Sequence, residues 1–283
     1  MSWPGRYRAA LCLSFDNLGE AAEIEIGARA PDDVGDHPSV SVALPAILGA
    51  LASHEIRATF FVEGLNAHLH PTALTSISAA GHEVAYHAWR HEQWAEMTPS
   101  AQSENLTRGL FAFEEIGLEA VGMRPPGGLL GPDWLGVARP MGLRYCSPAG
   151  SGAGVVVEED FEIALLPFQW QHVDASSVLP SLGAVREQIA GSPDPVSPAE
   201  LLSHLRREVD RLIAEGGFAA FVLHPFMLEW LGEDRLDALL EHVAVARRRG
   251  LWVTTCEAVA EHILHEADEF AGAATLDTVT WAD

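Results

Sequence analysis

The stretch Gly81-His-Glu-Val-Ala-Tyr-His-Ala-Trp-Arg-His91 is the segment from which the fold of this chain can be worked out. It opens with a short apolar run, Glu83 to Tyr86, which predicts a buried strand. It closes with His87 and His91, whose spacing brings two imidazoles to one side of a helical turn or tight loop, where they can share a metal ion. Because α/β folds place their chemistry at the carboxyl ends of strands, the stretch indicates such a fold with a metal site at a strand end.

Apolar runs and helical patterns alternate on both sides of this stretch. Strands are predicted at 9–15, 57–62, 83–86, 120–123, 143–146, 155–157, 162–166, 218–223 and 251–254. Helices are predicted at 41–51, 71–80, 99–116, 133–141, 198–214 and 234–249, and a last helix ends near residue 265. The alternation predicts one α/β domain over residues 1–265, with a parallel sheet that is open or closed into a barrel, and an acidic tail at 266–283.

Composition narrows the class of protein and its partners. The chain has 283 residues, of which 48% are hydrophobic, so it can bury a substantial core. A formal charge of −23 argues against nucleic acid and anionic membranes as partners, since both would repel the surface. The amino terminus lacks the apolar segment of a signal peptide, and no run reaches the ~18 apolar residues of a membrane span, so we expect a cytoplasmic protein. Cys12, Cys146 and Cys256 are predicted to be small buried residues.

Polar clusters follow several of the predicted strands. The clusters are Asp16-Asn17, His87 with His91, Arg124-Pro-Pro-Gly-Gly128, Trp170-Gln-His-Val-Asp174 and His224. Taken singly, these clusters are better explained as ordinary polar strand ends, turns or hydrogen-bonded histidines. Their shared placement indicates a functional site, and we expect the long loop at 18–39 to form one of its walls.

In order and spacing these clusters resemble the polysaccharide deacetylase superfamily, also known as carbohydrate esterase family 4 or the chitooligosaccharide deacetylase homology domain. The resemblance extends over roughly residues 9 to 265 and implies a distorted (β/α) barrel of about seven strands in a single domain. It implies the following roles: Asp16 as base, Asn17, His87 and His91 as metal ligands, Arg124 as the residue that orients the base, His224 as acid and Asp174 as the partner of that acid.

One position departs from the family pattern. Asn17 stands where the family usually has a ligating aspartate, so the site loses the anionic ligand of a divalent cation. Glu20 or Glu23 could supply a carboxylate from the loop, or the site could work without metal. The expected cofactor is a divalent metal ion, first Zn²⁺, with Co²⁺ or Ni²⁺ as alternatives. No other cofactor site is predicted.

Three further residues are predicted to contact the substrate: Tyr86, Pro126 and Trp170. Tyr86, or a backbone N–H near it, would complete an oxyanion hole. The segment His224-Pro-Phe-Met with Arg235 resembles the intracellular branch of the superfamily, which includes peptidoglycan deacetylase-like proteins and ring-opening allantoinases. This resemblance favours a small soluble substrate over an extracellular polymer.

The expected function is metal-dependent hydrolysis of a carbon–nitrogen bond other than a peptide bond. The first expectation is removal of an N-acetyl or similar acyl group from a small amino sugar or acylated amine. One alternative keeps the fold but opens a cyclic amide, with or without metal. Another is a protein that binds a ligand and no longer catalyses, its metal site eroded at Asn17. The sequence leaves a homo-oligomer open.

Overall fold

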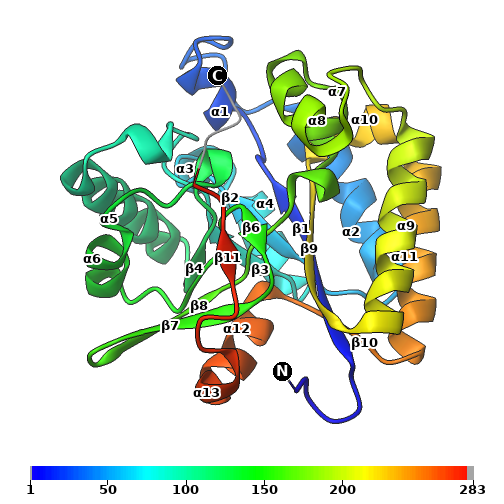
Figure 1. The fold of residues 1–283 in the computed structure, drawn as a ribbon. Helices are drawn as coiled ribbons and strands as arrows, with labels where there is room; N and C mark the ends of the chain where they lie inside the picture. Colours follow the sequence, from blue (N-terminus) through cyan, green and yellow to red (C-terminus); the bar gives the residue numbers. More distant parts are fainter. Residues whose placement is uncertain (1, 279–283) are drawn as a thin grey trace.

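The apolar runs form a nine-stranded curled sheet in the computed structural model, which describes residues 2–278 (Figure 1). The strand order is β10-β1-β2-β3-β4-β5-β8-β7, and β9 pairs with β1 along its full length. The strands are β1 (Ala9–Asp16), β2 (Thr59–Val62), β3 (Glu83–Tyr86), β4 (Gly122–Met123), β5 (Tyr145–Cys146), β7 (Gly154–Glu158), β8 (Phe161–Leu165), β9 (Gly217–Leu223) and β10 (Leu251–Thr254).

The pairings along this sheet are parallel except for the hairpin of β7 with β8. A bridge between Val173 and Val222 joins the segment after β8 to β9, so that the sheet curls back on itself. The predicted fold class, a distorted (β/α) barrel, is confirmed. Its nine strands exceed the expected seven because the β7 hairpin and β10 extend the sheet at its two ends.

Helices surround the sheet, and α9 and α11 lie side by side along one flank (Figure 1). The main helices are α2 (Leu44–Ser53), α4 (Pro71–Ala79), α5 (Pro99–Glu115), α6 (Trp134–Ala138), α8 (Gly183–Ala190), α9 (Pro198–Glu215), α11 (Glu233–Arg248) and α12 (Cys256–His265). The shorter ones are α1 (Ala21–Glu25), α3 (Asn66–Leu69), α7 (Asp174–Val178), α10 (Leu228–Leu231) and α13 (Ala267–Phe270). Ser197 and Glu200 form a capping box that starts α9, where two backbone N–H groups would otherwise lack partners.

Alternate residues of each strand enter two apolar cores. Leu11, Leu13 and Phe15 of β1 belong to the core that includes residues from the surrounding helices. Ala10 and Cys12 of the same strand belong to a second core. This alternation follows from the two-residue period of a strand, and it leaves both faces of the sheet buried. The three cysteines are buried and unpaired, as predicted.

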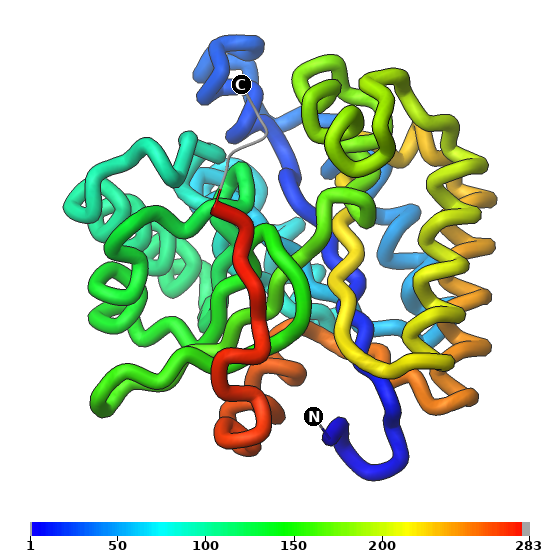
Figure 2. Tube along the Cα trace, in the orientation of Figure 1, coloured from blue at the N-terminus to red at the C-terminus, as the bar shows by residue number. Residues whose placement is uncertain are grey.

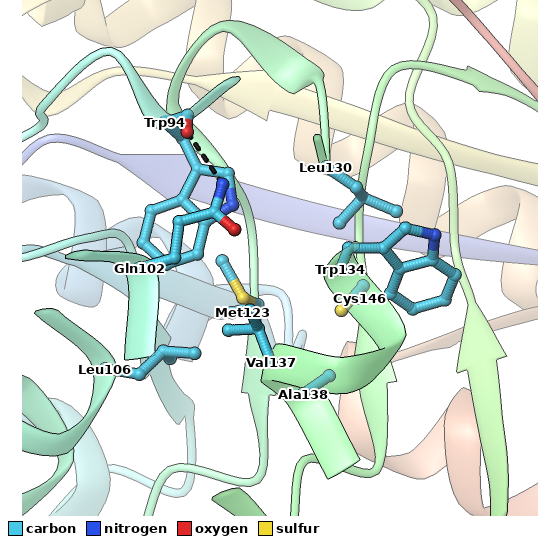
Figure 3. A pocket seen from close by; sticks show the side chains of 9 residues that line it. All are labelled: Trp94, Gln102, Leu106, Met123, Leu130, Trp134, Val137, Ala138 and Cys146. Atoms are coloured by element: carbon cyan, nitrogen blue, oxygen red, sulfur yellow. Dashed lines mark hydrogen bonds between the residues drawn. The ribbon is translucent and has the colours of Figure 1, made fainter. Parts of the chain in front are cut away.

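A small apolar pocket lies where α5 and α6 pack on β4 and β5 (Figure 3). Trp94, Leu106, Met123 and Trp134 line it, and the Gln102 amide donates a hydrogen bond to the Trp94 carbonyl at 2.8 Å. Its volume of about 10 Å³ is at the lower limit for one water molecule. The pocket is therefore a packing defect of the core and cannot hold a substrate.

Two segments expected to be irregular contain regular structure. The loop at 18–39 includes α1, and a π-helix, η1 (Ser39–Ala43), follows directly. The expected tail at 266–283 includes α13 and β11 (Thr275–Leu276), and β11 pairs antiparallel with β6 (Gly150–Ser151). Figure 2 shows this red segment running beside the green one. Residues 279–283 of that tail lie outside the described residues, and the boundary near 265 stays a prediction. No helix within residues 2–278 is long and apolar enough to cross a bilayer.

Candidate active site

The predicted base and acid follow neighbouring residues of two paired strands. Phe15 of β1 is in register with Leu223 of β9, so Asp16 and His224 come next at the carboxyl ends of both strands. These ends point toward the top of Figure 1. On the other side of β1, Asp16 is in register with Phe61 of β2. The parallel sheet thus collects side chains from distant parts of the chain at one end of the barrel.

Arg124 holds Asp16 in a buried ion pair. The two side chains are 1% and 5% exposed, and Arg124 Nη1 donates to Asp16 Oδ1 at 2.7 Å. The guanidinium also donates to the hydroxyls of Ser14 and Ser147 and lies over the ring of Phe61, at 4.0 Å from its centroid. Burial raises the pKa of Asp16, while the charge and hydrogen bond of Arg124 act in the opposite direction. The predicted orienting role of Arg124 is consistent with this geometry.

His87 and His91 lie with their ring centroids 4.9 Å apart. The Nδ1 of His87 is 2.7 Å from the Arg124 carbonyl, which can only accept, so Nδ1–H donates and Nε2 keeps its lone pair. Nε2 lies 4.0 Å from Asp16 Oδ2. Burial lowers the pKa of both histidines to about 3, so each ring is neutral, the form that binds metal.

The backbone around these residues is left-handed at three places. Asn17 has φ 59°, Ala88 has φ 62° and His91 has φ 72°. Residues other than glycine rarely adopt such angles, because they cost conformational energy. Strained backbone of this kind is commonly found at functional sites. The predicted pair therefore sits on a strained loop rather than on a helical turn.

The residues present fit a divalent metal with one amide ligand. Asn17 Oδ1 is buried and has no hydrogen-bond partner among residues 2–278, so its lone pairs are free for a cation. The two neutral imidazoles supply nitrogen ligands of the kind Zn²⁺ prefers. The described chain has no group of three or more His, Cys, Asp or Glu side chains placed to hold a metal ion, so a site here depends on the Asn17 oxygen.

His224 is paired with Asp174 as the motif implies. Asp174 Oδ1 lies 2.5 Å from His224 Nδ1, and Asp174 Oδ2 accepts from the His224 backbone N–H at 2.8 Å. Burial alone would lower the pKa of His224, but the charge and hydrogen bond of Asp174, together with the charge of Asp16, raise it. The imidazole is thus held in a fixed orientation in which its protonated form is favoured.

The prediction that the Tyr86 side chain contacts the substrate is wrong. It is 0% exposed, and its hydroxyl donates toward Asn105 of α5, at 2.6 Å from the carbonyl oxygen and 2.7 Å from Oδ1. Its ring packs edge-on against Phe113 of the same helix. Tyr86 therefore faces the helices that cover the sheet, while Ala85 belongs to the second core.

The two glutamates suggested as replacement ligands are engaged elsewhere. Glu20 is fully buried, contacts His70 and accepts from the Gly35 backbone N–H. Glu23 pairs with Arg29 at 2.7 Å and with His37 at 3.3 Å. Neither carboxylate is free to compensate for the missing charge at position 17.

Pro126 and Trp170 are the remaining residues that the sequence predicts to contact the substrate. Pro126 is buried at the start of a short 3-10 turn, two residues after Arg124. Trp170 stacks edge-on with Phe168 and lines a separate cavity of about 220 Å³ with Gln169 and Gln188. Whether either side chain contacts the substrate stays a prediction.

Known proteins resemble this chain in part of its sequence and in its fold. Residues 32–146 match the polysaccharide deacetylase family. A peptidoglycan-N-acetylglucosamine deacetylase of Listeria monocytogenes is 33% identical over 109 residues, 38% of this chain, and the match spans only 22% of that relative's length. A crystal structure from Mycobacterium smegmatis with a polysaccharide deacetylase designation is 27% identical, with a TM-score of 0.81 over 99% of this chain and 97% of that one. An allantoinase structure, 18% identical, shares the fold with a TM-score of 0.72 over 93% and 92% of the two chains. Over residues 32–146 the chain is thus similar in sequence to the polysaccharide deacetylase family, and over nearly its whole length it shares the fold of the Mycobacterium smegmatis structure.

Proposed function

We propose that this protein hydrolyses the carbon–nitrogen bond of a small acylated amine, most simply an N-acetylated amino sugar. The observation that carries the proposal is that Asp16 and His224 stand at the carboxyl ends of the paired strands β1 and β9. Arg124 pairs with Asp16, and Asp174 pairs with His224. Amide hydrolysis needs a group that takes a proton from water and a group that gives one to the departing nitrogen. Two titratable groups with opposite tasks, each oriented by a partner, meet that need.

The side chains can divide the reaction as follows. Asp16, ionised beside Arg124, takes a proton from the attacking water. His224, with its pKa raised by Asp174, then donates a proton to the leaving nitrogen. The Arg124 guanidinium keeps Asp16 ionised and fixed while both steps take place.

A divalent metal would be held by His87, His91 and the Asn17 oxygen. When bound, such an ion would lower the pKa of water and polarise the scissile carbonyl. The metal content of untagged protein, purified without chelator, tests this part of the proposal. We expect about one equivalent of a first-row divalent metal in the parent protein and its loss in a His87→Ala/His91→Ala variant.

Acetate release from N-acetylglucosamine and other small N-acetylated amines tests the activity. We expect Asp16→Asn and His224→Gln each to lower kcat by about 10²–10⁴-fold, the usual contribution of a positioned acid or base. His265→Gln is the matched control, because its side chain is 83% exposed on α12 and should leave the rate unchanged. Equal rates in all variants would refute the assignment of base and acid.

The neutral side chain at position 17 favours testing one second function, ring opening of a cyclic amide without metal. A panel of cyclic amides, assayed with and without chelator, distinguishes the two. Chelator-resistant turnover of a ring amide would support this second function. Tight binding of one compound without turnover of any would instead support a non-catalytic binding protein.

A further inference from the structure

A groove of about 840 Å³ opens beside the segment that follows His224. One wall is formed by residues 23–43, which follow the base on β1, and the other by residues 225–235, which follow the acid on β9. Its size falls within the range of small-molecule sites in proteins. Since no role in proton transfer requires such a groove, it is a candidate for the part of the substrate that does not react.

The position of the acid indicates which half of the substrate enters the groove. His224 must face the leaving nitrogen to protonate it. The ring of Phe226 lies 5.1 Å from the His224 ring, centroid to centroid, and Phe226 lines the groove. The acyl half must instead lie toward Asp16 and His87, where the water is activated. The amine half therefore extends past His224 onto Phe226.

The groove wall combines apolar surface with negative charge. Phe226 is 41% exposed and Val42 is 64% exposed, and both line the same groove, so they give it an accessible apolar surface. Glu229, Glu233 and Asp234 also line the groove, with Arg235 on the same wall, while on the opposite wall Glu23 and Arg29 pair with each other at 2.7 Å. The carboxylates do not define the site, but they disfavour a second negative charge in it.

We infer that this groove binds the amine half of the substrate, and that Phe226 is the residue that selects it. The inference rests on the proposed function. It assigns the substrate class as amines that have an apolar face to stack on Phe226 and that are neutral or cationic beyond the scissile bond. Amines that carry a carboxylate are excluded from this class.

Three acetamides with the same ring test the inference: N-acetylbenzylamine, its para-aminomethyl derivative and its para-carboxylate derivative. N-methylacetamide, which has no ring, is the reference. We expect kcat/KM to be at least about tenfold lower for the carboxylate than for the cationic compound, with a difference that shrinks as salt is added. Phe226→Ala should lower the ratio of kcat/KM between N-acetylbenzylamine and N-methylacetamide by about three- to tenfold. Phe111→Ala is the matched control, since Phe111 is 59% exposed on α5 and is not part of the groove.

Binding of the three ring compounds, measured by calorimetry, separates this inference from the proposed function. If none of them is hydrolysed, the proposed activity fails, yet weaker binding of N-acetylbenzylamine to Phe226→Ala than to Phe111→Ala would still support the groove. Equal affinity of both variants, equal affinity for the carboxylate and cationic compounds, or no binding of any of them would overturn the inference.

Discussion

Replacing Arg124 by methionine should destabilise the protein by about 3–5 kcal/mol, because it leaves the Asp16 carboxylate buried without its partner. Both side chains are at most 5% exposed, so water cannot take the place of the guanidinium. The variant also removes hydrogen bonds to the Ser14 and Ser147 hydroxyls, each worth about 1 kcal/mol. Methionine has a similar length and fills most of the space over Phe61.

The double variant Arg124→Met/Asp16→Asn separates charge from packing. Without the buried carboxylate, we expect the double variant to recover at least about 2 kcal/mol of the loss, although it should be inactive. Urea unfolding followed by circular dichroism gives the free energy of unfolding of the parent, the two single variants and the double variant. If the double variant is as unstable as Arg124→Met, the loss comes from packing and hydrogen bonds, and the charge argument is refuted.

Other expectations follow from single sites. Burial raises the pKa of Glu63 to about 8. The folded protein therefore keeps a proton that the unfolded chain releases near pH ~4.3. The free energy of unfolding should fall as pH rises between these two values. Glu63→Gln should flatten this fall by up to about 1.4 kcal/mol per pH unit, and an unchanged slope would contradict the burial argument. Gly109→Ala in α5 would place its Cβ 2.0 Å from the Tyr86 ring and should cost about 1–3 kcal/mol by urea unfolding. Gly49→Ala in α2 meets no atom within 4 Å and should instead stabilise by about 0.5–1 kcal/mol. Asn17→Asp should tighten zinc binding in a competition assay, and unchanged affinity would mean that this side chain does not face the metal.

Much of the fold could be predicted because its strands are short apolar runs between turn residues. The strand at 83–86 and the start of α9 at Ser197 lie where the sequence predicts them. Helix α1 was not predicted, since its five residues have too few apolar positions to show a period. Helix α8 lies in a stretch rich in Pro and Ser, where turn signals conceal the pattern.

The composition of the candidate site could be predicted, but not the direction of its side chains. Tyr86 is predicted to contribute to an oxyanion hole, yet both faces of its strand are buried, so apolar periodicity cannot tell whether its side chain meets the barrel interior. The contact between Glu20 and His70 joins residues from two separate loops and leaves no local pattern in the sequence. The left-handed backbone at Asn17 and His91 is likewise set by tertiary packing.

Strand β1 has a consequence for the order in which the protein can assemble. On one edge it pairs with β9, and on the other it pairs first with β10 and then with β2. Because β1 is the first described strand of the chain, it is synthesised before all its partners. Two of its three partners are more than 200 residues away along the chain. Contacts of such long range carry a large loop-closure cost and slow folding. During synthesis one edge of β1 stays unpaired until β9 emerges, and an unpaired apolar strand edge is prone to aggregation.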